Sequence, residues 1–560
     1  MSMDAATPST AGRPPRPAAT LVLVRDAHPG IEVLLLLRAE RGDHNSGAWV
    51  FPGGLVDVPD REWHGCCTGL DDAAASARLQ LPQGGLDYHV AALRECFEEC
   101  GLLLAVDARG EMPGGDALRA LQHWRPALHA GERTLGDFCR ETGLCLAVDR
   151  LAYLSHWLTP LGRAKRFDAR FFIAEAPPHQ QALHDGSEMT AHRWIRPADA
   201  LAQGDALKLM GPTRATLQTL APLGSAAAAM AWARSMRTIP RIFPRIGVGA
   251  EGERPVMPDE HAWAELGRLD PTGHGGASYE IVAERAVRLS QRLIRVTAGN
   301  RGVMTGPGTN SYLVGDASAS EWVVIDPGPL DEGHVQALVA AAPGPIRRIF
   351  VTHTHSDHSP AAARLKALTG AALHGRIADF PDRQDTSFVP DRLLGGGERI
   401  ALGQGTTLRV IHTPGHASNH LCYLLEEEKT LFTGDHVMQS STVVINPPDG
   451  DMAAYLASLR ALADACDPDI EWLAPGHGFL MAQPRRAFEA IIEHRLAREA
   501  KVLAALRQLG RATLDELLAR VYDDVPAGLH VVATRSLLAH LIKLRNEELA
   551  EVSGGRWSVS

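Results

Sequence analysis

Three histidines and one aspartate stand within six residues of each other, at His353, His355, Asp357 and His358. Imidazole and carboxylate groups are the ligands that zinc and similar divalent ions take in proteins. A single histidine of this kind is more often a surface or packed core residue. Four ligand-type side chains in so short a stretch are costly to desolvate without a cation, so the spacing predicts a metal site.

Further ligand types recur downstream, each after an apolar run. The pairs Gly415-His416, Gly434-Asp435 and Gly476-His477 all place a histidine or an aspartate directly after a glycine. Glycine lets the backbone turn sharply, so that the next side chain points into a shared site. The recurrence predicts that these three residues join the first cluster around the metal.

The elements that must position these ligands are short buried strands. The β-branched run Ile349–Thr352 predicts a strand that leads directly into the histidine cluster, and the loop after a rigid strand is where ligands converge. Apolar runs at 288–296 and 306–314 predict further strands, joined by a glycine turn. Asp326 follows another such run, Val323–Ile325, and is expected either to support a metal ligand or to cap a turn.

A second kind of chemistry is indicated by the stretch Arg94–Leu102. On a helix, Glu95 shares one side with Glu98 and Glu99, which lie three and four residues further on. Like charges this close repel each other unless a cation joins them, and oxygen ligands suit magnesium or manganese. A solvated acidic helix face is the common alternative. Gly101, which fits a helix end, and a glycine pair upstream favour the metal.

The upstream pair, Gly53 and Gly54, ends the loop Gly47–Gly54. Glycine permits a positive φ and a close approach of the backbone to a ligand, so both residues are candidate substrate-binding positions. A plain tight turn would need the same residues. Before this loop, the runs 19–24 and 31–38 predict the two strands of a hairpin.

Gly54, Asp60 and the Arg94–Leu102 stretch together resemble the Nudix box. The sequence departs from the family in two ways: Asp60 stands where glutamate is usual, and the spacer after it is long, from Arg61 to Leu93. A similar insert marks the branch that resembles the peroxisomal coenzyme A diphosphatase. Two later segments resemble the same branch, Ser155–Pro160 and Arg166–Phe172.

The Nudix resemblance covers residues 18–223 and implies an α/β/α sandwich that cleaves a nucleoside diphosphate linked to another group, with coenzyme A or acyl-coenzyme A favoured. The implied catalytic residues, which would hold magnesium or manganese against the diphosphate, are Glu95, Glu98 and Glu99. Arg94 is expected to orient these carboxylates rather than to touch substrate. The base is expected to be one of the helix glutamates or a later acid such as Glu188.

The histidine-rich segments resemble the metallo-β-lactamase superfamily over residues 287–483, which implies an αββα sandwich with the site at one edge. The resemblance assigns one ion to His353, His355 and His416, a second ion to Asp357, His358 and His477, and a bridge between them to Asp435. Asp357, also a catalytic candidate, and Asp435 resemble the thioesterase and phosphodiesterase branches rather than antibiotic-hydrolysing members with a cysteine ligand. Zinc is favoured because imidazole outnumbers carboxylate, with iron or manganese as alternatives.

The implied chemistry is hydrolysis. A water shared by two adjacent cations has its pKa lowered from 15.7 towards about 7, and the cations screen the charge that develops on a carbonyl or phosphoryl oxygen. The ligands alone do not fix which electrophile is attacked. Asn310 and His420 are expected near the substrate, whereas His412 and His436 are expected in ordinary polar or packed positions.

The tail, residues 484–560, predicts a long helix over 484–509, two more helices over 512–521 and 527–546, and a short hairpin over 549–559. This order resembles a winged helix, and with the metal motifs it is similar to the β-lactamase-like protein 2 branch. From Arg485 onwards there are 12 Lys and Arg against 10 Asp and Glu, a balance of only +2. We therefore expect the tail to pack over the active-site rim or to form a homodimer contact rather than to bind DNA.

The length of 560 residues predicts about three to four domains. The formal net charge of -10 favours solubility and argues against a broad nucleic-acid surface. No apolar run approaches the ~20 residues of a membrane span, and the eight cysteines show no framework spacing, so we expect a cytoplasmic protein without a membrane partner. Residues 1–17 predict a disordered leader. Residues 224–286 predict an interdomain linker with a little local structure, such as a short helix over 230–236, that wraps one of the domains.

The resulting expectation is a multidomain chain of α/β and α+β class, with a Nudix sandwich, an αββα sandwich and a small winged-helix domain. The first functional hypothesis is a pair of metal-dependent hydrolases. One half would act on nucleotides or coenzyme A-type compounds, and the other on a thioester, ester or phosphodiester. The second is an endoribonuclease that acts on single-stranded RNA, and the third is a nucleotide-sensing protein with a decayed Nudix site.

Overall fold

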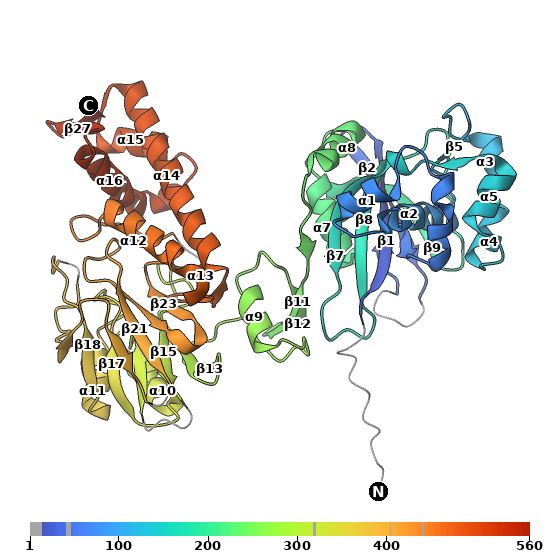
Figure 1. Ribbon diagram of the computed structural model, residues 1–560. Coiled ribbons are helices and arrows are strands. Elements are labelled where there is room, and N and C mark those ends of the chain that lie inside the picture. The colour runs from blue at the N-terminus through green and yellow to red at the C-terminus, as the bar shows by residue number, and fades with distance from the viewer. Residues whose placement is uncertain (1–13, 41–45, 317–320, 383, 404, 440–441) are drawn as a thin grey trace, which may run out of the picture. The chain divides into compact units, whose positions relative to one another are not determined.

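The computed structural model describes residues 14–40, 46–316, 321–382, 384–403, 405–439 and 442–560. The chain divides into two compact units, Met1–Arg245 and Ile246–Ser560 (Figure 1). None of the helices in the described ranges has the combination of length and apolar character that crossing a membrane demands. Most of the predicted leader lies outside the described residues, and its last two residues already belong to the first strand, which begins at Arg16.

The N-terminal unit is built on a mixed sheet. Among the described residues, eight strands pair in the order β10-β7-β8-β1-β2-β3, with β4 on β1 and β9 on β2. β1 (Arg16–Asp26) and β2 (Ile31–Arg38) form the predicted antiparallel hairpin. The side chains of Leu21 to Val24 are all buried, as expected for a central strand covered on both faces. The other strands of this sheet are β3 (Trp49–Val50), β4 (Gly53–Leu55), β7 (Ala152–Leu158), β8 (Phe167–Glu175), β9 (Met189–Ile195) and β10 (Arg241–Ile242).

Helix α2 (Gly85–Cys100) carries the acidic motif and packs over β1 and β4. Its Cys96 and Phe97 are fully buried in the core against the sheet. The helix ends at Gly101, whose φ of 69° lies in the left-handed region that glycine tolerates, as the sequence predicts. The remaining helices are η1 (Val58–Cys66), α1 (Asp72–Leu79), α3 (Gly115–Leu121), α4 (Trp124–His129), α5 (Leu135–Thr142), η2 (Val148–Arg150), α6 (Pro197–Ala202), η3 (Gly204–Ala206) and α7 (Gly211–Leu220), and the strands β5 (Ala105–Val106) and β6 (Cys145–Leu146) pair separately.

The stretch expected to be a linker, 224–286, is folded and is shared between the two units. Helix α8 (Ala226–Ser235) packs against β7 and β8 of the N-terminal unit. β11 (Arg245–Gly249) and β12 (Gly252–Val256) form a hairpin, and α9 (Trp263–Leu269) docks on the C-terminal unit. Glu265 of α9 forms a bidentate ion pair with the buried Arg295, with N–O distances of 2.6 and 2.9 Å. The short helix predicted over 230–236 overlaps α8, whereas frequent Pro and Gly residues interrupt the pattern of the other elements, each of which is short.

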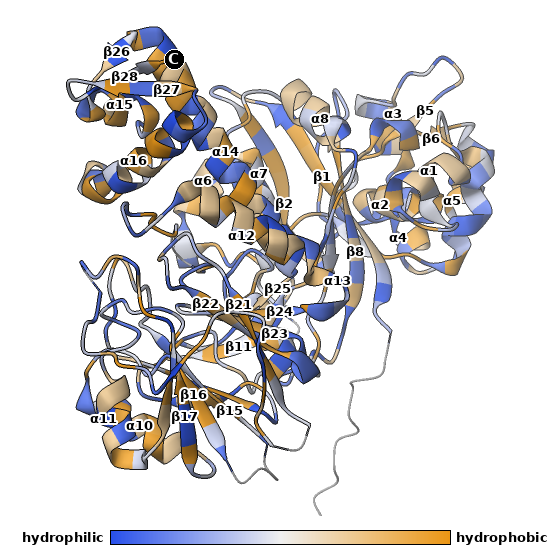
Figure 2. Ribbon diagram, turned by 60° about the vertical axis from the view of Figure 1, so that its left-hand side comes forward, coloured by the Kyte–Doolittle hydropathy of each residue, from blue (hydrophilic) through white to orange (hydrophobic). Residues whose placement is uncertain are grey.

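The C-terminal unit is built on two sheets that pack face to face. One sheet runs β13-β14-β15-β16-β17-β18-β19 and the other runs β20-β21-β22-β23-β24-β25. Apolar side chains from both sheets form a shared core. In Figure 2 the ribbon is orange at the hydrophobic residues of β15, β16 and β17. The strands are β13 (Ala286–Arg288), β14 (Leu293–Thr297), β15 (Asn310–Gly315), β16 (Trp322–Ile325), β17 (Ile346–Phe350), β18 (Ala372–Gly375), β19 (Arg392–Leu393), β20 (Arg399–Ala401), β21 (Thr407–His412), β22 (Leu421–Leu425), β23 (Thr430–Gly434), β24 (Trp472–Pro475) and β25 (Met481–Ala482).

Helices cover the outer face of each sheet. α10 (Glu332–Ala341) and α11 (Ala362–Thr369) pack on the first sheet, while α12 (Met452–Asp464) packs on the second, near α13 (Cys466–Asp469). The αββα expectation is therefore confirmed. The ligand-bearing loops follow β17, β21, β23 and β24, so the fold brings the ends of strands from both sheets together.

The tail forms the predicted winged helix. α14 (Pro484–Leu509), α15 (Leu514–Val521) and α16 (His530–Asn546) are followed by the hairpin β27 (Ala550–Ser553) and β28 (Arg556–Val559), with β26 (Arg511–Ala512) on β28. Thr513 and Glu516 form a capping box at the start of α15, which explains why this helix begins two residues later than predicted. Apolar residues of all three helices and of the hairpin share one core.

Candidate metal centres

The first ligand group consists of His353 and His355, just after β17, and His416, just after β21. One nitrogen of each ring lies within 4.8 Å of the other two. His355 Nδ1 is 2.9 Å from His353 Nε2 and 3.0 Å from His416 Nε2. Burial lowers the pKa of His355 to about 3 and that of His353 well below its usual value, so both rings are neutral and have a lone pair to offer. Three imidazoles that converge on one point are a typical transition-metal site.

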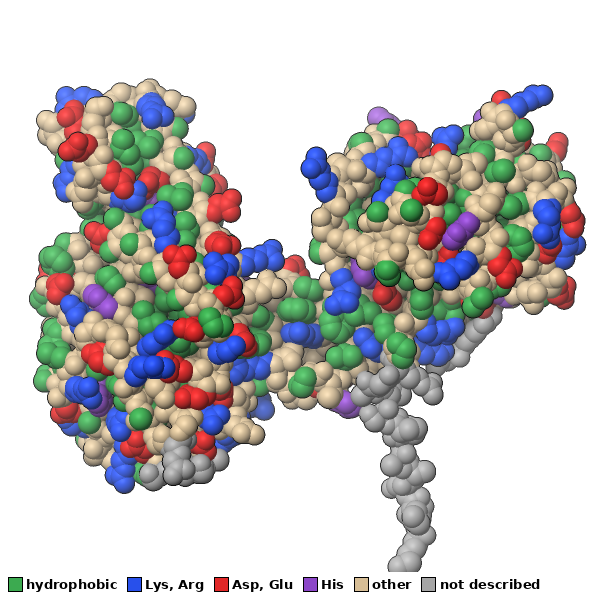
Figure 3. Space-filling model, viewed as in Figure 1, with side chains coloured by type: hydrophobic (Ala, Val, Ile, Leu, Met, Phe, Trp, Pro, Cys, Tyr) green, Lys and Arg blue, Asp and Glu red, His purple; other side chains and the backbone are tan. Residues whose placement is uncertain are grey.

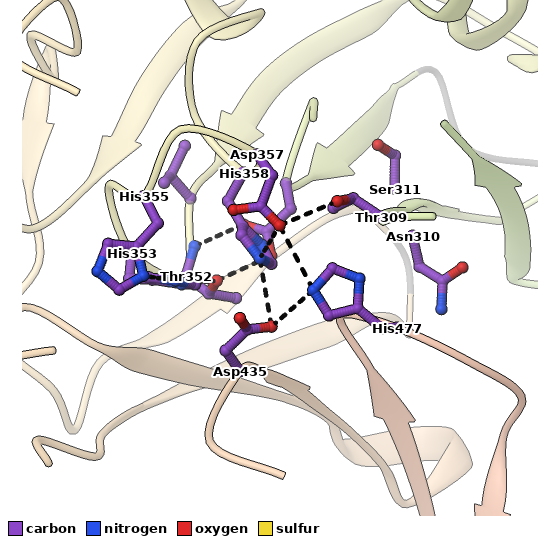
Figure 4. Close-up of polar contacts among 12 residues, drawn as sticks. Thr309, Asn310, Ser311, Thr352, His353, His355, Asp357, His358, Asp435 and His477 are labelled. Carbon is purple, nitrogen blue, oxygen red and sulfur yellow. Dashed lines mark hydrogen bonds and ion pairs between the residues drawn. The ribbon is translucent and has the colours of Figure 1, made fainter. Parts of the chain in front are cut away.

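The second group contains Asp357, His358, Asp435 and His477, and one ligand atom of each lies within 4.8 Å of the others. Figure 4 shows the four side chains pointing towards a common centre. His358 Nε2 and His477 Nε2 are each 3.2 Å from Asp435 Oδ1 and 3.4 Å from Asp357 Oδ2. Two imidazoles and two carboxylates thus surround one position.

Asp435 faces both groups. Its Oδ1 belongs to the second group, and its Oδ2 lies 3.8 Å from His416 Nε2 of the first. Burial acts to raise the pKa of Asp435, but the neighbouring His477 and His358 hold it well below the usual value. The carboxylate is therefore ionised between the two groups, as a bridging ligand requires.

The residues present fit divalent ions. In the second group, three buried ligand atoms lack a hydrogen-bond partner among the described residues: His358 Nε2, Asp435 Oδ1 and His477 Nε2. Burying polar atoms without partners costs several kcal/mol in total, at roughly 1–3 kcal/mol each. A cation at the centre of the group would satisfy all three.

Hydrogen bonds behind the ligands fix the direction of the rings. His358 Nδ1 donates to Asp326 Oδ2 at 2.9 Å, and His477 Nδ1 donates to the Gly308 carbonyl at 3.1 Å. Asp326 also accepts from the Thr352 amide at 2.7 Å and from the Thr352 hydroxyl at 2.8 Å. Since each Nδ1 donates, each Nε2 is left free to face the centre. Asp326 thus supports a ligand, one of the two roles expected for it.

Two residues expected near the substrate, Asn310 and His420, have no solvent-exposed side chain. Asn310 is fully buried, and its amide donates to the carbonyls of Pro475 and Gly478 at 3.0 and 2.8 Å. His420 is also fully buried, with Nδ1 2.9 Å from the Thr413 hydroxyl. Asn310 therefore ties β15 to the loop of His477, and His420 packs beneath the metal ligands. Motif position alone does not distinguish such supporting residues from those that face solvent.

The remaining histidines and one threonine complete the surroundings. His436 is fully buried, and His412 Nε2 donates to the Ser418 carbonyl at 3.0 Å, so both are packed, as expected. Thr309 was not singled out, yet its hydroxyl donates to Asp357 Oδ2 at 3.2 Å (Figure 4). The signal that the sequence offers for Thr309 is its place directly after Gly308, in the predicted strand 306–314.

The acidic motif of the N-terminal unit is organised around Arg94. The guanidinium holds the buried Asp60 through two hydrogen bonds of 2.9 and 3.2 Å, and it donates to Glu95 Oε1 at 2.9 Å. Glu98 Oε1 is buried without a hydrogen-bond partner among the described residues, and burial raises the pKa of Glu98 to about 7. Arg94 therefore orients carboxylates, as expected, and Asp60 takes part through Arg94.

Glu99 lies against the glycine loop. Its Oε2 accepts from the Gly53 amide at 2.9 Å, and burial together with nearby Glu95 raises its pKa well above the usual value. Neither Gly53 nor Gly54 has a positive φ. A Cβ on Gly54 would stand 2.3 Å from Glu95 Oε1, and one on Gly53 would stand 2.5 Å from the Ala19 carbonyl. The glycines thus serve close packing against the acidic helix and β1, rather than an unusual backbone conformation.

A third set of ligand-type atoms, from His64, Asp72 and Asp87, also lies within 4.8 Å. Asp72 accepts from the amides of Gly84 and Leu86 at 3.0 and 2.9 Å, and His64 Nε2 is 2.7 Å from Asp87 Oδ1. These bonds cap the start of α2, which accounts for the set without an ion.

Comparison with known proteins places these sites in families. Family models match residues 69–209 as "NUDT19 Nudix domain", residues 304–477 as "Metallo-beta-lactamase superfamily" and residues 513–557 as "Beta-lactamase associated winged helix domain". A protein named atrochrysone carboxyl ACP thioesterase, from Aspergillus chevalieri, is 32% identical over 295 residues, which are 49% of this chain and 88% of that protein. The chain belongs to the metallo-beta-lactamase superfamily. It also carries a Nudix domain and a winged-helix domain.

The chain is also similar to one further relative and to one solved structure. The beta-lactamase-like protein 2 homolog of Caenorhabditis elegans is 28% identical over 271 residues, or 47% of this chain and 88% of that protein. A solved Nudix hydrolase from Alicyclobacillus acidocaldarius matches 39% of this chain and 97% of its own at 28% identity, with a TM-score of 0.34. The chain is a hydrolase, and its metallo-beta-lactamase fold implies divalent metal binding.

Proposed function

We propose that the chain is a bifunctional hydrolase whose C-terminal unit cleaves a thioester and whose Nudix unit cleaves a nucleoside diphosphate, with coenzyme A-type compounds as the shared substrate class. One observation carries the proposal for the C-terminal unit. Seven ligand side chains form two groups, and the ionised Asp435 has one oxygen towards each. This is the arrangement that a pair of ions sharing a bridging carboxylate would need.

His353, His355 and His416 would hold one ion, and Asp357, His358, Asp435 and His477 would hold the other, with zinc favoured by the nitrogen-rich ligands. When bound, such ions supply hydroxide near neutral pH and screen the charge that builds up on a carbonyl oxygen. The chain's own contribution is orientation. The Thr309 hydroxyl donates to Asp357 and holds that carboxylate in place, while Asp326 keeps His358 Nε2 aimed at the centre.

A thioester is favoured over RNA for two reasons. A relative that is 32% identical is named as an acyl carrier protein thioesterase. Binding single-stranded RNA without sequence preference calls for a continuous basic groove. The chain has a net charge of -10, and on the face shown in Figure 3 the basic and acidic side chains are interspersed.

In the Nudix unit, Glu95, Glu98 and Glu99 would hold magnesium or manganese against the diphosphate. Burial raises the pKa of each of these carboxyls, so they hold protons more tightly than exposed acids until a cation arrives. Arg94 positions them through its bonds to Asp60 and Glu95. Because a thioester of coenzyme A also contains a diphosphate, one compound offers a target to both units.

The test uses the full chain with acyl-coenzyme A, free coenzyme A and labelled single-stranded RNA. We expect thiol release from acyl-coenzyme A and diphosphate cleavage of both coenzyme A compounds. Asp435→Ala should abolish thiol release and spare diphosphate cleavage, and the double variant Glu98→Gln/Glu99→Gln should do the reverse. RNA cleavage that Asp435→Ala abolishes, without any thiol release, would replace the thioester proposal. Binding without turnover of any substrate would point to a sensor.

A further inference from the structure

Helix α14, the first element of the winged helix, reaches back to the metal site. Its Arg495 is 2% exposed, and the guanidinium donates through Nη2 to the Val443 carbonyl. The carbonyl of the next residue, Val444, accepts from His416 Nδ1 at 2.8 Å. Arg495 and the candidate ligand His416 therefore bind the carbonyls of two consecutive residues.

A second path runs from the same arginine to Asp435. The Arg495 guanidinium lies 5.7 Å from the ring centroid of Tyr455, a fully buried residue of α12. The Tyr455 hydroxyl donates to the His436 carbonyl at 2.9 Å, directly after Asp435 in the chain. The loop before His416 also touches this point, because a Cβ on Gly415 would stand 2.3 Å from the Tyr455 Cα.

We propose that Arg495 is a positioning residue that couples the winged-helix unit to metal retention. The inference rests on the proposed function, in which His416 and Asp435 bind ions. For His416 Nε2 to face an ion, Nδ1 must donate, and the Val444 carbonyl is the acceptor that fixes the ring. Arg495 holds the segment that presents this carbonyl, so α14 helps to set the geometry of a ligand from outside the αββα sandwich.

The space beside this segment allows it to move when the arginine is truncated. A cavity of about 210 Å³ lies between Val443, Tyr455, Ile491 and Arg495. Side chains around an open space can move into it when a neighbour is truncated. Without Arg495, the segment 442–444 therefore has room to relax away from His416.

The same helix provides a matched control, Arg498. Its guanidinium also donates to a backbone carbonyl, that of Val521, and lies 4.5 Å from the ring centroid of Tyr522. It pairs in addition with Asp524 at 2.7 and 3.1 Å. All of these partners belong to the winged helix. Truncating Arg498 therefore disturbs an equivalent set of contacts that does not lead to the metal ligands.

The experiment compares Arg495→Ala, Arg495→Lys and Arg498→Ala in the full chain, loaded with zinc. Zinc retention is measured by competition with a chelator of known affinity, and cobalt-loaded samples report ligand geometry by visible absorption. Loss of support behind a ligand typically weakens metal binding about 10–100-fold. We expect about tenfold weaker retention and an altered cobalt spectrum for Arg495→Ala, partial recovery for Arg495→Lys, and wild-type behaviour for Arg498→Ala.

Equal zinc retention and identical cobalt spectra in Arg495→Ala and Arg498→Ala would overturn the inference and leave the proposed function intact. A wild-type chain that retains no transition metal would overturn the proposed function itself. If Arg495→Ala does not fold, Tyr455→Phe decides the matter, because it removes only the hydroxyl that holds His436. We expect a changed cobalt spectrum for that variant, and an unchanged one would count against the coupling.

Discussion

Replacing Asp326 by asparagine should weaken metal binding although Asp326 touches no ion. Its carboxylate accepts three hydrogen bonds, from the Thr352 amide, the Thr352 hydroxyl and His358 Nδ1, at 2.7, 2.8 and 2.9 Å. The Thr352 hydroxyl oxygen is in turn 3.0 Å from His353 Nδ1. One buried carboxylate therefore supports a ligand in each of the two groups.

The size of the effect follows from the geometry. An asparagine amide offers one acceptor oxygen, so in one orientation its NH2 faces His358 Nδ1 and in the other it faces the Thr352 amide. At least one charge-assisted hydrogen bond is lost in either case, worth about 1.5–3 kcal/mol. At about 1.4 kcal/mol per factor of ten, zinc binding should weaken about 10–100-fold.

The assay is chelator competition for zinc, with Asp331→Asn as the matched control. Asp331 caps α10 by accepting from the His334 amide at 3.0 Å, and asparagine is an equally good cap. The control should therefore keep wild-type zinc affinity and stability. If Asp326→Asn bound zinc within twofold of the wild type, the idea that this carboxylate orients His358 would be refuted.

Three further predictions concern the rest of the chain. Gly54→Ala would place a Cβ 2.3 Å from Glu95 Oε1, and this overpacking should lower the rate of diphosphate cleavage about tenfold or more. The control Gly65→Ala, which has no atom within 4 Å of its Cβ, should keep the wild-type rate. Equal rates in the two variants would contradict a role for the Gly54 contact. Glu265→Ala should lower the free energy of unfolding, measured with urea, by about 3–5 kcal/mol, because Arg295 would stay buried without its ion-pair partner. A loss below about 1 kcal/mol would mean that the ion pair contributes little to stability. Burial lowers the pKa of His89 to about 4 from an ordinary 6.5, so the unfolded chain takes up a proton more readily and stability falls as the pH drops from 6.5 towards 4. In His89→Gln, the loss of unfolding free energy between pH 6.5 and pH 4, measured with urea, should be about 3 kcal/mol smaller than in the wild type. An unchanged pH dependence would exclude His89 as the cause of the wild-type loss.

Much of the metal site was predictable because its residues follow a local rule. Each apolar run that ends in glycine and then histidine or aspartate forms a strand end in the structure, at Asp435 and His477 for example. Strand ends of one sheet edge meet in space, so ligands far apart in sequence could be expected to converge. The winged helix was equally predictable, because its three helices have clear apolar periodicity and α14 begins and ends at the predicted residues.

Other features depend on contacts that no local pattern encodes. Asn310 and His420 belong to the metal-binding region, but their complete burial follows from the way that loops cross beneath the ligands. Asp60 departs from the family, and only the structure reveals its two bonds to Arg94 across the long insert. Pro and Gly break the pattern of the connecting stretch and so predict a linker, while Arg295, the ion-pair partner of Glu265 in this stretch, lies thirty residues further along the chain.

The ion pair between Glu265 of α9 and Arg295 determines where an isolated C-terminal fragment should begin. Starting the C-terminal half at Val287, where its recognisable motifs begin, would discard Glu265 and leave Arg295, 2% exposed, with neither its counter-charge nor access to water. It would also remove the carboxylate that accepts from the Leu480 amide at 2.7 Å, close to the loop that presents His477. A fragment that starts at Ile246 keeps both contacts. If a fragment that starts at Val287 is inactive, the loss of these two contacts therefore explains the result, without implying that the C-terminal unit lacks enzymatic activity.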